Sequence, residues 1–307
     1  MAREVLPNVI SFDDGRILSR NMVPGQRVYD EELHTVDGQE FRTWNPTRSK
    51  LGAYVVKGGR AVDVRPDANV LYLGAANGTT VSHVSDMLSR GLVVAVEFSP
   101  RSFRDLLRMS DPRGNIVPIL ADAWRPELYA RFAGKVDLLF QDIAQRQQAA
   151  IFSKNIEAFK PALAMIAVKA RSVDVASHPR QVYEAVAAEI TERTGYEVID
   201  SLDLGPYEKD HAALVLRPGA GGKRQERRRA ERDERPAPRE ERPQRRDERP
   251  QQGGFQKRGW GPPPGGKPQG GAPPRDERPR GKFQPREDRP QRDERPRRDF
   301  GDRRGWR

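Results

Sequence analysis

Hydrophobic and polar positions divide the first 217 residues into two kinds of sequence. Up to about residue 45, short apolar runs are separated by turn-forming residues at 13–15, 24–25 and 37–38, a pattern typical of short antiparallel strands. Further along, continuous apolar runs alternate with segments whose apolar residues recur at helical spacing. We therefore predict a small β-rich subdomain over residues 1–45 and an α/β domain over residues 46–217.

The α/β domain is predicted to alternate between strand and helix. Strands are expected at 70–73, 92–98, 116–120, 136–140, 163–168, 196–204 and 211–216, and helices at 79–89, 100–109, 126–132, 145–159 and 179–194. This alternation predicts a mostly parallel, doubly wound sheet. Residues 205–210 are too few for a helical crossover, so the last two strands are expected to pair antiparallel at the end of the sheet.

Residues 218–307 have a different composition from the rest of the chain. They contain no Leu, Ile, Val or Met, and 29 of them are Pro or Gly. Because such a segment cannot bury enough apolar surface to offset the loss of chain entropy, we expect a disordered tail. Arg-Asp-Glu-Arg-Pro occurs four times in the tail, but its irregular spacing and its proline argue against a helical or solenoid repeat.

The tail also carries the excess positive charge. It has 28 Lys and Arg against 16 Asp and Glu, a net charge of +12, whereas residues 1–217 have a net charge of −1. We interpret the tail as a low-specificity RNA-contacting arm, in which arginines bind phosphates and scattered aromatic rings stack on bases. A solvating extension and a self-association segment are the alternatives.

Composition excludes several classes of protein and of site. The chain has no cysteine, which excludes disulfide scaffolds, Cys-ligated zinc and thiol nucleophiles. The four histidines lack metal-ligand spacing, so no metal site is expected. The N-terminus has no signal-peptide core, and no apolar run approaches the ~20 residues of a membrane span. We expect a soluble, cytoplasmic protein without a metal and without membrane association.

Candidate chemistry lies at the carboxyl ends of the predicted strands, where ligands bind in open α/β sheets. After the first strand of the α/β domain, Gly74 and Gly78 would let a ligand approach the backbone, and Thr79 or Thr80 is expected to cap the next helix. Ala76 stands where the dinucleotide fingerprint has its middle glycine. A cofactor without a diphosphate is therefore favoured.

Acidic residues follow the next three strands. Glu97 lies about 20 residues after the glycine loop and suits a ribose diol. Asp122 suits an adenine amine, with Phe98 against the ring, and Asp142 ends the following strand. A single acid of this kind is equally explained as a solvated loop residue. Three at successive strand ends predict a nucleoside pocket, which favours S-adenosylmethionine over NAD.

Two lysines and a histidine accompany these acids. Lys169 follows the strand at 163–168, Lys50 enters the first helix, and His211 begins the last strand. Taken one at a time, each lysine is equally explained as a surface residue, and a lone histidine is more often structural than catalytic. Together with the acids they lie in segments that resemble the fibrillarin family, at 45–51, 72–80, 97–100, 142–145, 166–172 and 206–211. The resemblance covers nearly all of residues 1–217. The chain resembles the archaeal form, because the eukaryotic protein usually carries a Gly/Arg-rich N-terminal extension, whereas this sequence starts almost at the predicted fold.

The resemblance implies a Rossmann-like class I methyltransferase that uses S-adenosylmethionine to methylate ribose 2′-oxygens of rRNA and tRNA. It implies four partners, namely a box C/D guide RNA, its target RNA, a Nop-domain scaffold protein and a kink-turn-binding ribosomal-type protein. The Lys-Asp-Lys-His tetrad of the family falls on Lys50, Asp142, Lys169 and His211. The expected cofactor contacts are Gly74, Ala75, Gly78, Thr79, Thr80, Glu97, Phe98, Asp122, Ala123, Asp142, Ile143, Ala144 and Gln145.

The chemistry of the reaction assigns roles to the tetrad. A ribose hydroxyl is a poor nucleophile and a methyl sulfonium is already activated, so only positioning and proton removal remain. Lys169 is expected to orient or deprotonate the hydroxyl and Asp142 to hold that lysine, with Lys50 and His211 positioning Asp142 and the ribose. Which group takes the proton stays open. A non-catalytic RNA-binding scaffold and a nucleotide-dependent oxidoreductase are the competing functions.

Overall fold

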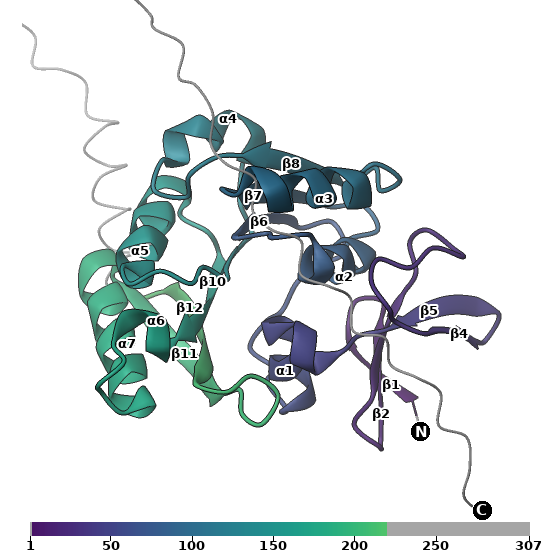
Figure 1. Ribbon diagram of the computed structural model, residues 1–307, viewed down its shortest axis with the longest axis horizontal. Coiled ribbons are helices and arrows are strands. Elements are labelled where there is room, and N and C mark those ends of the chain that lie inside the picture. The colour runs from purple at the N-terminus through teal and green to yellow at the C-terminus, as the bar shows by residue number, and fades with distance from the viewer. Residues whose placement is uncertain (1, 220–307) are drawn as a thin grey trace, which may run out of the picture. The chain divides into compact units, whose positions relative to one another are not determined.

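The computed structural model of the protein describes residues 2–219 (Figure 1). The tail expected from residue 218 onward, with every interpretation of it, lies outside the described residues apart from residues 218 and 219. Within residues 2–219, none of the helices combines the length and the apolar character that crossing a membrane requires.

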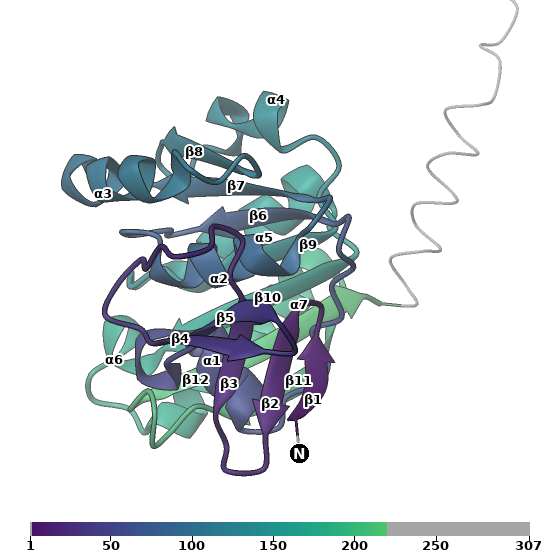
Figure 2. The same ribbon diagram turned by 90° about the vertical axis from the view of Figure 1, so that its right-hand side faces the viewer.

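The N-terminal part forms the predicted β-rich unit. Its five strands are β1 (Ala2–Leu6), β2 (Val9–Phe12), β3 (Ile17–Arg20), β4 (Leu33–Val36) and β5 (Gln39–Thr43). They form an antiparallel sheet in the order β1-β2-β3-β5-β4 (Figure 2). Asp37 and Gly38, in the predicted turn between β4 and β5, both have positive φ, as a tight hairpin requires.

The remaining strands form one seven-stranded sheet in the order β11-β12-β10-β9-β6-β7-β8. They are β6 (Asn69–Leu73), β7 (Leu92–Glu97), β8 (Ile116–Leu120), β9 (Leu138–Gln141), β10 (Leu163–Lys169), β11 (Tyr196–Asp203) and β12 (His211–Pro218). All pairings among β6 to β10 are parallel, whereas β12 pairs antiparallel with both β10 and β11. Both the mostly parallel sheet and its antiparallel end are confirmed.

Helices cover both faces of this sheet. They are α1 (Lys50–Val56), α2 (Thr79–Met87), α3 (Pro100–Ser110), α4 (Ala130–Ala133), α5 (Gln148–Phe159), α6 (Ala170–Val173) and α7 (Pro179–Thr194), with 3-10 turns η1 (Pro46–Arg48) and η2 (Pro126–Leu128). In β6, Val70 and Tyr72 pack in the core with α1, α2 and α3, whereas Leu71 and Leu73 pack in the core with α5 and α7. A strand buried on both faces reads as a continuous apolar run.

The predicted helix at 126–132 is broken in the structure. It is replaced by η2 and the short helix α4, which are separated by Tyr129 at φ −125°. The Tyr129 ring is fully buried, and its hydroxyl donates to Asn155 Oδ1 at 2.5 Å, a bond to α5. This tertiary contact overrides the helical periodicity, because a buried phenol needs a hydrogen-bond partner.

The N-terminal sheet is joined to α2 by buried charges. Arg42 of β5 and Asp86 of α2 are fully buried and form an ion pair at 2.7 Å. Arg113 reaches the other oxygen of Asp86 at 2.6 Å, and Glu31 binds Arg42 at 2.5 Å. Next to them, His83 of α2 is fully buried. Because each charge has a partner of opposite sign, burial of these four side chains is tolerated. Together they fix the N-terminal sheet to α2, a helix that packs on the seven-stranded sheet.

Candidate active site

Sheet order brings the candidate residues into one row. β9, β6, β7 and β8 are neighbours in that order, with Gln141 opposite Leu73 and Glu97 opposite Leu120. Asp142, Gly74, Glu97 and Asp122, which lie at or just after the ends of these strands, therefore follow one another along the same edge. The acids that are far apart in the sequence meet because parallel strands end at the same edge.

The row continues past Asp142 in the other direction. β10 lies beside β9, and β12 lies beside β10 with Lys169 directly opposite His211 in the antiparallel register. Since β12 runs antiparallel, its first residue meets the last residue of β10. The edge thus reads His211, Lys169, Asp142, Gly74, Glu97, Asp122, with a basic end and an acidic end on either side of Asp142.

The glycine loop lies close against Asp142. Gly74 has φ +81°, and a Cβ atom there would lie 2.4 Å from the Asp142 carbonyl oxygen, so only glycine fits. Gly78, at φ +91°, is the N-cap of α2 and no side chain caps that helix. The prediction that Thr79 or Thr80 caps it is wrong: both are helical residues. The first N–H groups of α2 are therefore left without a side-chain acceptor, an arrangement that suits a carboxylate ligand.

Glu97 is nearly buried and shapes this loop. Its two carboxylate oxygens accept from the backbone N–H groups of Ala76 at 2.8 Å and Ser99 at 2.7 Å. Each oxygen keeps a second acceptor site, which fits the hydroxyls of a ribose. Beside it, the Phe98 ring is 68% exposed, and Asp122 accepts from the Trp124 N–H with one oxygen only. The donor and acceptor set fits an adenosyl group.

The other predicted contacts differ in exposure. Ala75 and Ala123 are buried, and Ile143 is half-buried. Ala144 and Gln145 are exposed on the loop that leads to α5. The Thr80 hydroxyl already has a hydrogen-bond partner within the protein, because it lies 3.1 Å from the hydroxyl of Ser49. Ser49 caps α1, so the glycine-loop helix is tied directly to the helix that begins at Lys50.

Lys50 lies between two carboxylates. Its Nζ is 3.3 Å from Asp142 Oδ2 and 3.7 Å from Glu208 Oε1. Glu208 Oε2 is in turn 4.0 Å from His211 Nδ1. The structure therefore brings Lys50, Asp142 and His211 together as expected, and it adds Glu208, which the sequence reasoning did not select although it lies in the segment at 206–211.

Lys169 is positioned through its backbone. Its N–H donates to Gln148 Oε1 and its carbonyl accepts from Gln148 Nε2, both at 3.1 Å. Gln148 is fully buried, and its own carbonyl accepts from Gln141 Nε2 at 2.7 Å. This pairing ties the end of β10 to the end of β9, and nothing in the sequence pattern indicated it. The expectation that Asp142 holds Lys169 is not met within residues 2–219, where Asp142 pairs with Lys50.

One hydrogen bond settles how His211 is protonated when neutral. His211 Nδ1 lies 2.7 Å from the Lys209 carbonyl oxygen. A carbonyl can only accept, so Nδ1 carries the proton and Nε2 has the lone pair.

The Tyr72 phenol is buried beneath the site. Burial raises the pKa of Tyr72 well above its usual value, and the negative charge of Asp142 raises it further.

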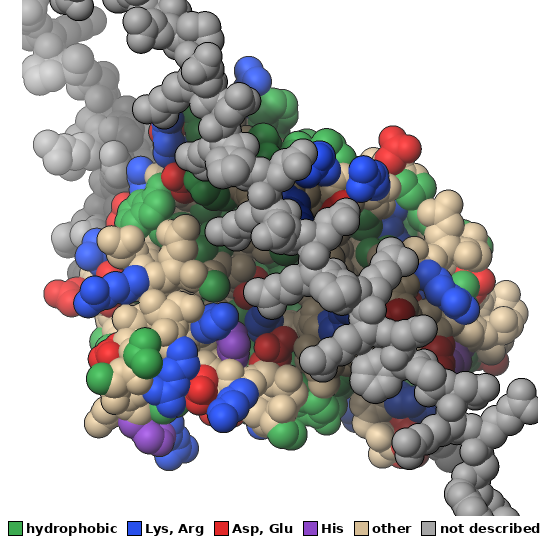
Figure 3. Space-filling view, in the orientation of Figure 1, with side chains coloured by type: hydrophobic (Ala, Val, Ile, Leu, Met, Phe, Trp, Pro, Cys, Tyr) green, Lys and Arg blue, Asp and Glu red, His purple; other side chains and the backbone are tan. Residues whose placement is uncertain are grey.

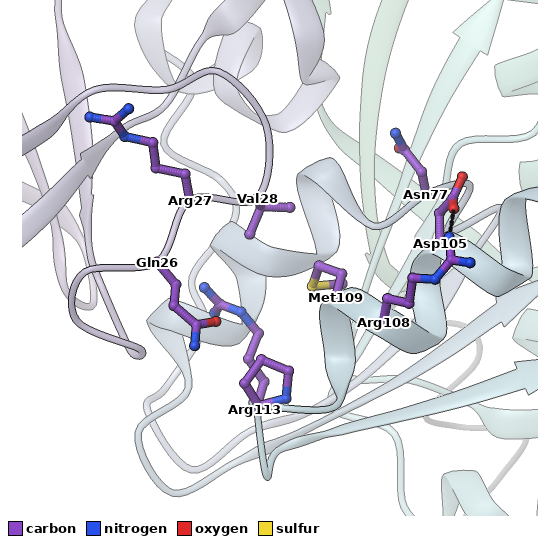
Figure 4. Close-up of a pocket in the computed structure, with 9 residues that line it drawn as sticks. Gln26, Arg27, Val28, Asn77, Asp105, Arg108, Met109 and Arg113 are labelled. Atoms are coloured by element: carbon purple, nitrogen blue, oxygen red, sulfur yellow. Dashed lines mark hydrogen bonds and ion pairs between the residues drawn. The ribbon is translucent and has the colours of Figure 1, made fainter.

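Acidic, basic and histidine side chains gather near the middle of the part of the molecule that is visible in Figure 3. A separate pocket of about 390 Å³ opens beside α3 and is drawn in Figure 4. The glycine loop contributes Asn77 to its lining, and Asp105 and Arg108 pair across one side at 3.0 Å. None of the tetrad lines this pocket, so it is distinct from the candidate active site.

Comparison with known proteins agrees with the geometry. A family model for fibrillarin matches residues 4–218. The fibrillarin-like rRNA/tRNA 2′-O-methyltransferase of Pyrococcus furiosus is 48% identical over 214 residues, which is 68% of this chain and 93% of the relative. Aeropyrum pernix fibrillarin, solved with natively bound S-adenosyl-L-methionine, superposes with a TM-score of 0.60 at 39% identity over 70% of this chain and 99% of that one. A solved fibrillarin/Nop5p complex superposes with a TM-score of 0.63 at 38% identity, and the match covers 70% of this chain and 100% of that one.

Proposed function

Because the chain belongs to the fibrillarin family, we propose that it methylates ribose 2′-hydroxyls of rRNA and tRNA with S-adenosylmethionine. In this proposal it is the catalytic subunit of a box C/D guide-RNA ribonucleoprotein. The observation that carries it is the row along the sheet edge, in which Asp142 separates a nucleoside-binding half from a half built of Lys169 and His211. A cofactor in one half and a ribose in the other would meet at Asp142.

The cofactor half holds its ligand by shape and by acceptors. Gly74 lets the ligand lie against the backbone, and the uncapped start of α2 receives its carboxylate. Glu97 accepts from the ribose hydroxyls, Asp122 accepts from the base, and the exposed ring of Phe98 stacks on it. The same pocket has no glycine-rich diphosphate cradle, which argues against the oxidoreductase alternative.

The reactive half positions the hydroxyl and removes its proton. When bound, S-adenosylmethionine supplies a methyl group on a sulfonium, so the ribose oxygen gains the methyl while the C–S electron pair stays on sulfur. Asp142, anchored by Lys50 at 3.3 Å, faces that positive centre. Lys169 orients the 2′-oxygen from the end of β10. The lone pair on His211 Nε2 provides an acceptor for the hydroxyl proton.

Partners deliver the RNA to this site. Residues 1–217 have a net charge of −1, which is unfavourable for binding RNA alone. The family includes a solved complex with Nop5p, and we propose a Nop-domain scaffold protein here as well. A kink-turn-binding ribosomal-type protein and the box C/D guide RNA complete the proposed assembly, with base pairing to the guide selecting the nucleotide.

The proposal is tested by transfer of labelled methyl to a target RNA paired with its guide. We expect 2′-O-methylation at one guide-specified ribose in the full assembly, and much less when the scaffold protein is left out. Titration with S-adenosylmethionine separates this from a non-catalytic scaffold, which would bind RNA without the cofactor. Binding of NAD in place of S-adenosylmethionine would contradict the proposal, as would an inactive assembly that binds the cofactor.

A further inference from the structure

Glu208 is an acid whose charged neighbours within 4.0 Å, among residues 2–219, both belong to the candidate reaction site. It lies in the turn between β11 and β12, and its side chain is 15% exposed. One of its oxygens lies 3.7 Å from Lys50 Nζ, and the other lies 4.0 Å from His211 Nδ1. Within residues 2–219, no N–H group donates a hydrogen bond to this carboxylate, and it makes no other ion pair.

This pattern differs from that of the buried acids that support the fold. Glu97 accepts two backbone N–H groups, and Glu31 accepts the N–H groups of Val28 and Tyr29. Such acids hold the main chain in place, and their removal would leave buried donors unpaired. The carboxylate of Glu208 holds no part of the main chain, so its contacts point to the reaction rather than to folding.

The turn around Glu208 is held by the main chain and by Lys57. The Glu208 N–H donates to the Leu204 carbonyl at 3.1 Å, and the Gly205 carbonyl accepts from Lys57 Nζ at the end of α1. His211 Nδ1 donates to the Lys209 carbonyl. None of these bonds uses the Glu208 side chain, so a substitution that keeps its size leaves the turn in place.

We propose that Glu208 is a positioning residue for methyl transfer: it shares Lys50 with Asp142 and stabilises the positive charge that His211 acquires with the hydroxyl proton. The inference rests on the proposed function. The proton moves from the 2′-oxygen to His211 Nε2, and the oxygen electron pair it leaves forms the bond to the methyl carbon. Glu208 does not touch the substrate and acts through the two residues that flank it.

Charges on every side of His211 bear on this role. Glu208 faces Nδ1 from the turn, Lys169 lies opposite on β10, and Lys50 and Asp142 lie beyond Glu208. Asp210, next in sequence, directs its carboxylate to Arg171 at 3.1 Å. Glu208 is therefore the acid nearest to the ring, and its charge balances the lysine that would otherwise repel a protonated His211.

The test is the Glu208→Gln variant in the full assembly with scaffold protein, kink-turn-binding protein, guide and target RNA. Single-turnover methyl transfer is measured across pH, together with cofactor affinity and Tm. We expect the plateau rate to fall about tenfold and the acidic limb of the pH–rate profile to move to lower pH, because the carboxylate ~4 Å away no longer favours the protonated ring. Cofactor affinity and Tm should stay at wild-type values, and Glu208→Asp should restore part of the rate.

Asp210→Asn is the matched control, because it removes one negative charge from the same turn but leaves the contacts of Glu208 with Lys50 and His211 unchanged. We expect a wild-type rate and an unmoved acidic limb. The inference is overturned if Glu208→Gln matches the wild type, if Asp210→Asn moves the limb equally, or if Glu208→Gln loses rate through a lower Tm or weaker cofactor binding. An inactive wild-type assembly overturns the proposed function and the inference together, whereas equal wild-type and variant rates overturn the inference alone.

Discussion

Lys169 is the residue whose removal should separate catalysis from cofactor binding. Its backbone is clamped by Gln148, so Lys169→Ala leaves the end of β10 in place and removes only the ammonium. We expect methyl transfer to fall by at least ~100-fold, because the 2′-oxygen loses the group that orients it for attack. Affinity for S-adenosylmethionine, measured by calorimetry, should stay within about twofold, because the acids that accept the nucleoside lie on β7 and β8.

Lys135→Ala is the control for that loss of charge. Lys135 is exposed and precedes β9, at the end of the sheet opposite the row. We expect wild-type transfer from this variant. Wild-type turnover by Lys169→Ala would rule out the role assigned to that lysine.

Residue types and their spacing were enough to select most of the candidate site, but not its internal pairing. Glu97, Asp122 and Asp142 could be chosen because each follows an apolar strand. Gln148 could not, since a glutamine at the start of a helix has no pattern that distinguishes it from its exposed neighbour Gln147. Both Lys50 and Lys169 were expected beside Asp142, because either lysine is a suitable counterion, and the fold places Lys50 at 3.3 Å.

At the scale of elements, α2 should make folding sensitive to mild acid. His83 is fully buried in α2, with Nε2 2.6 Å from the Tyr29 hydroxyl. Burial lowers the pKa of His83 well below its usual value, and the charges of Arg42 and Arg113 lower it further. The unfolded chain therefore takes up a proton below about pH 6.5 that the folded chain does not. The stability that neutral His83 gives the folded state is fully present above about pH 6.5 and is lost as the pH falls below that value.

Denaturant unfolding between pH 8 and pH 5 measures this effect. The free energy of unfolding of the wild type should fall below pH 6.5 more steeply than that of His83→Asn, by up to ~1.4 kcal/mol per pH unit. His178→Asn removes an exposed histidine that caps α7, and asparagine caps equally well, so its slope should match the wild type. Parallel slopes for all three proteins would contradict the assignment.

Elements were predictable where the local pattern and the tertiary structure demand the same conformation. The strands at 70–73 and 163–168 are apolar throughout, and β6 and β10 are interior strands of a sheet covered by helices, so the pattern is unambiguous. The helix expected at 126–132 failed because Tyr129 is drawn into the core by Asn155. The cap expected from Thr79 or Thr80 failed because Gly78 has the backbone angles that start α2 there.

At the scale of the whole molecule, the net charge differs sharply between residues 1–217 and residues 218–307. Removal of residues 220–307 leaves β12 complete, because that strand ends at Pro218, and takes away a net charge of +12. We expect RNA affinity to depend less steeply on salt concentration, because fewer counterions are released from the RNA. S-adenosylmethionine affinity should be unchanged. An unchanged salt slope would favour the solvating extension over the RNA-contacting arm.

The sequence by itself determined the alternation of strands and helices, the acids and glycines at strand ends, and the family that these segments resemble. These features are local, because burial on both faces of a strand and the φ of a turn are recorded within a few residues. Only the tertiary structure decided that Lys169 faces His211, that Lys50 is shared between Asp142 and Glu208, and that Gln148 ties β9 to β10. Those contacts depend on strand order and direction, which bring together residues from opposite ends of the domain and which no local pattern records.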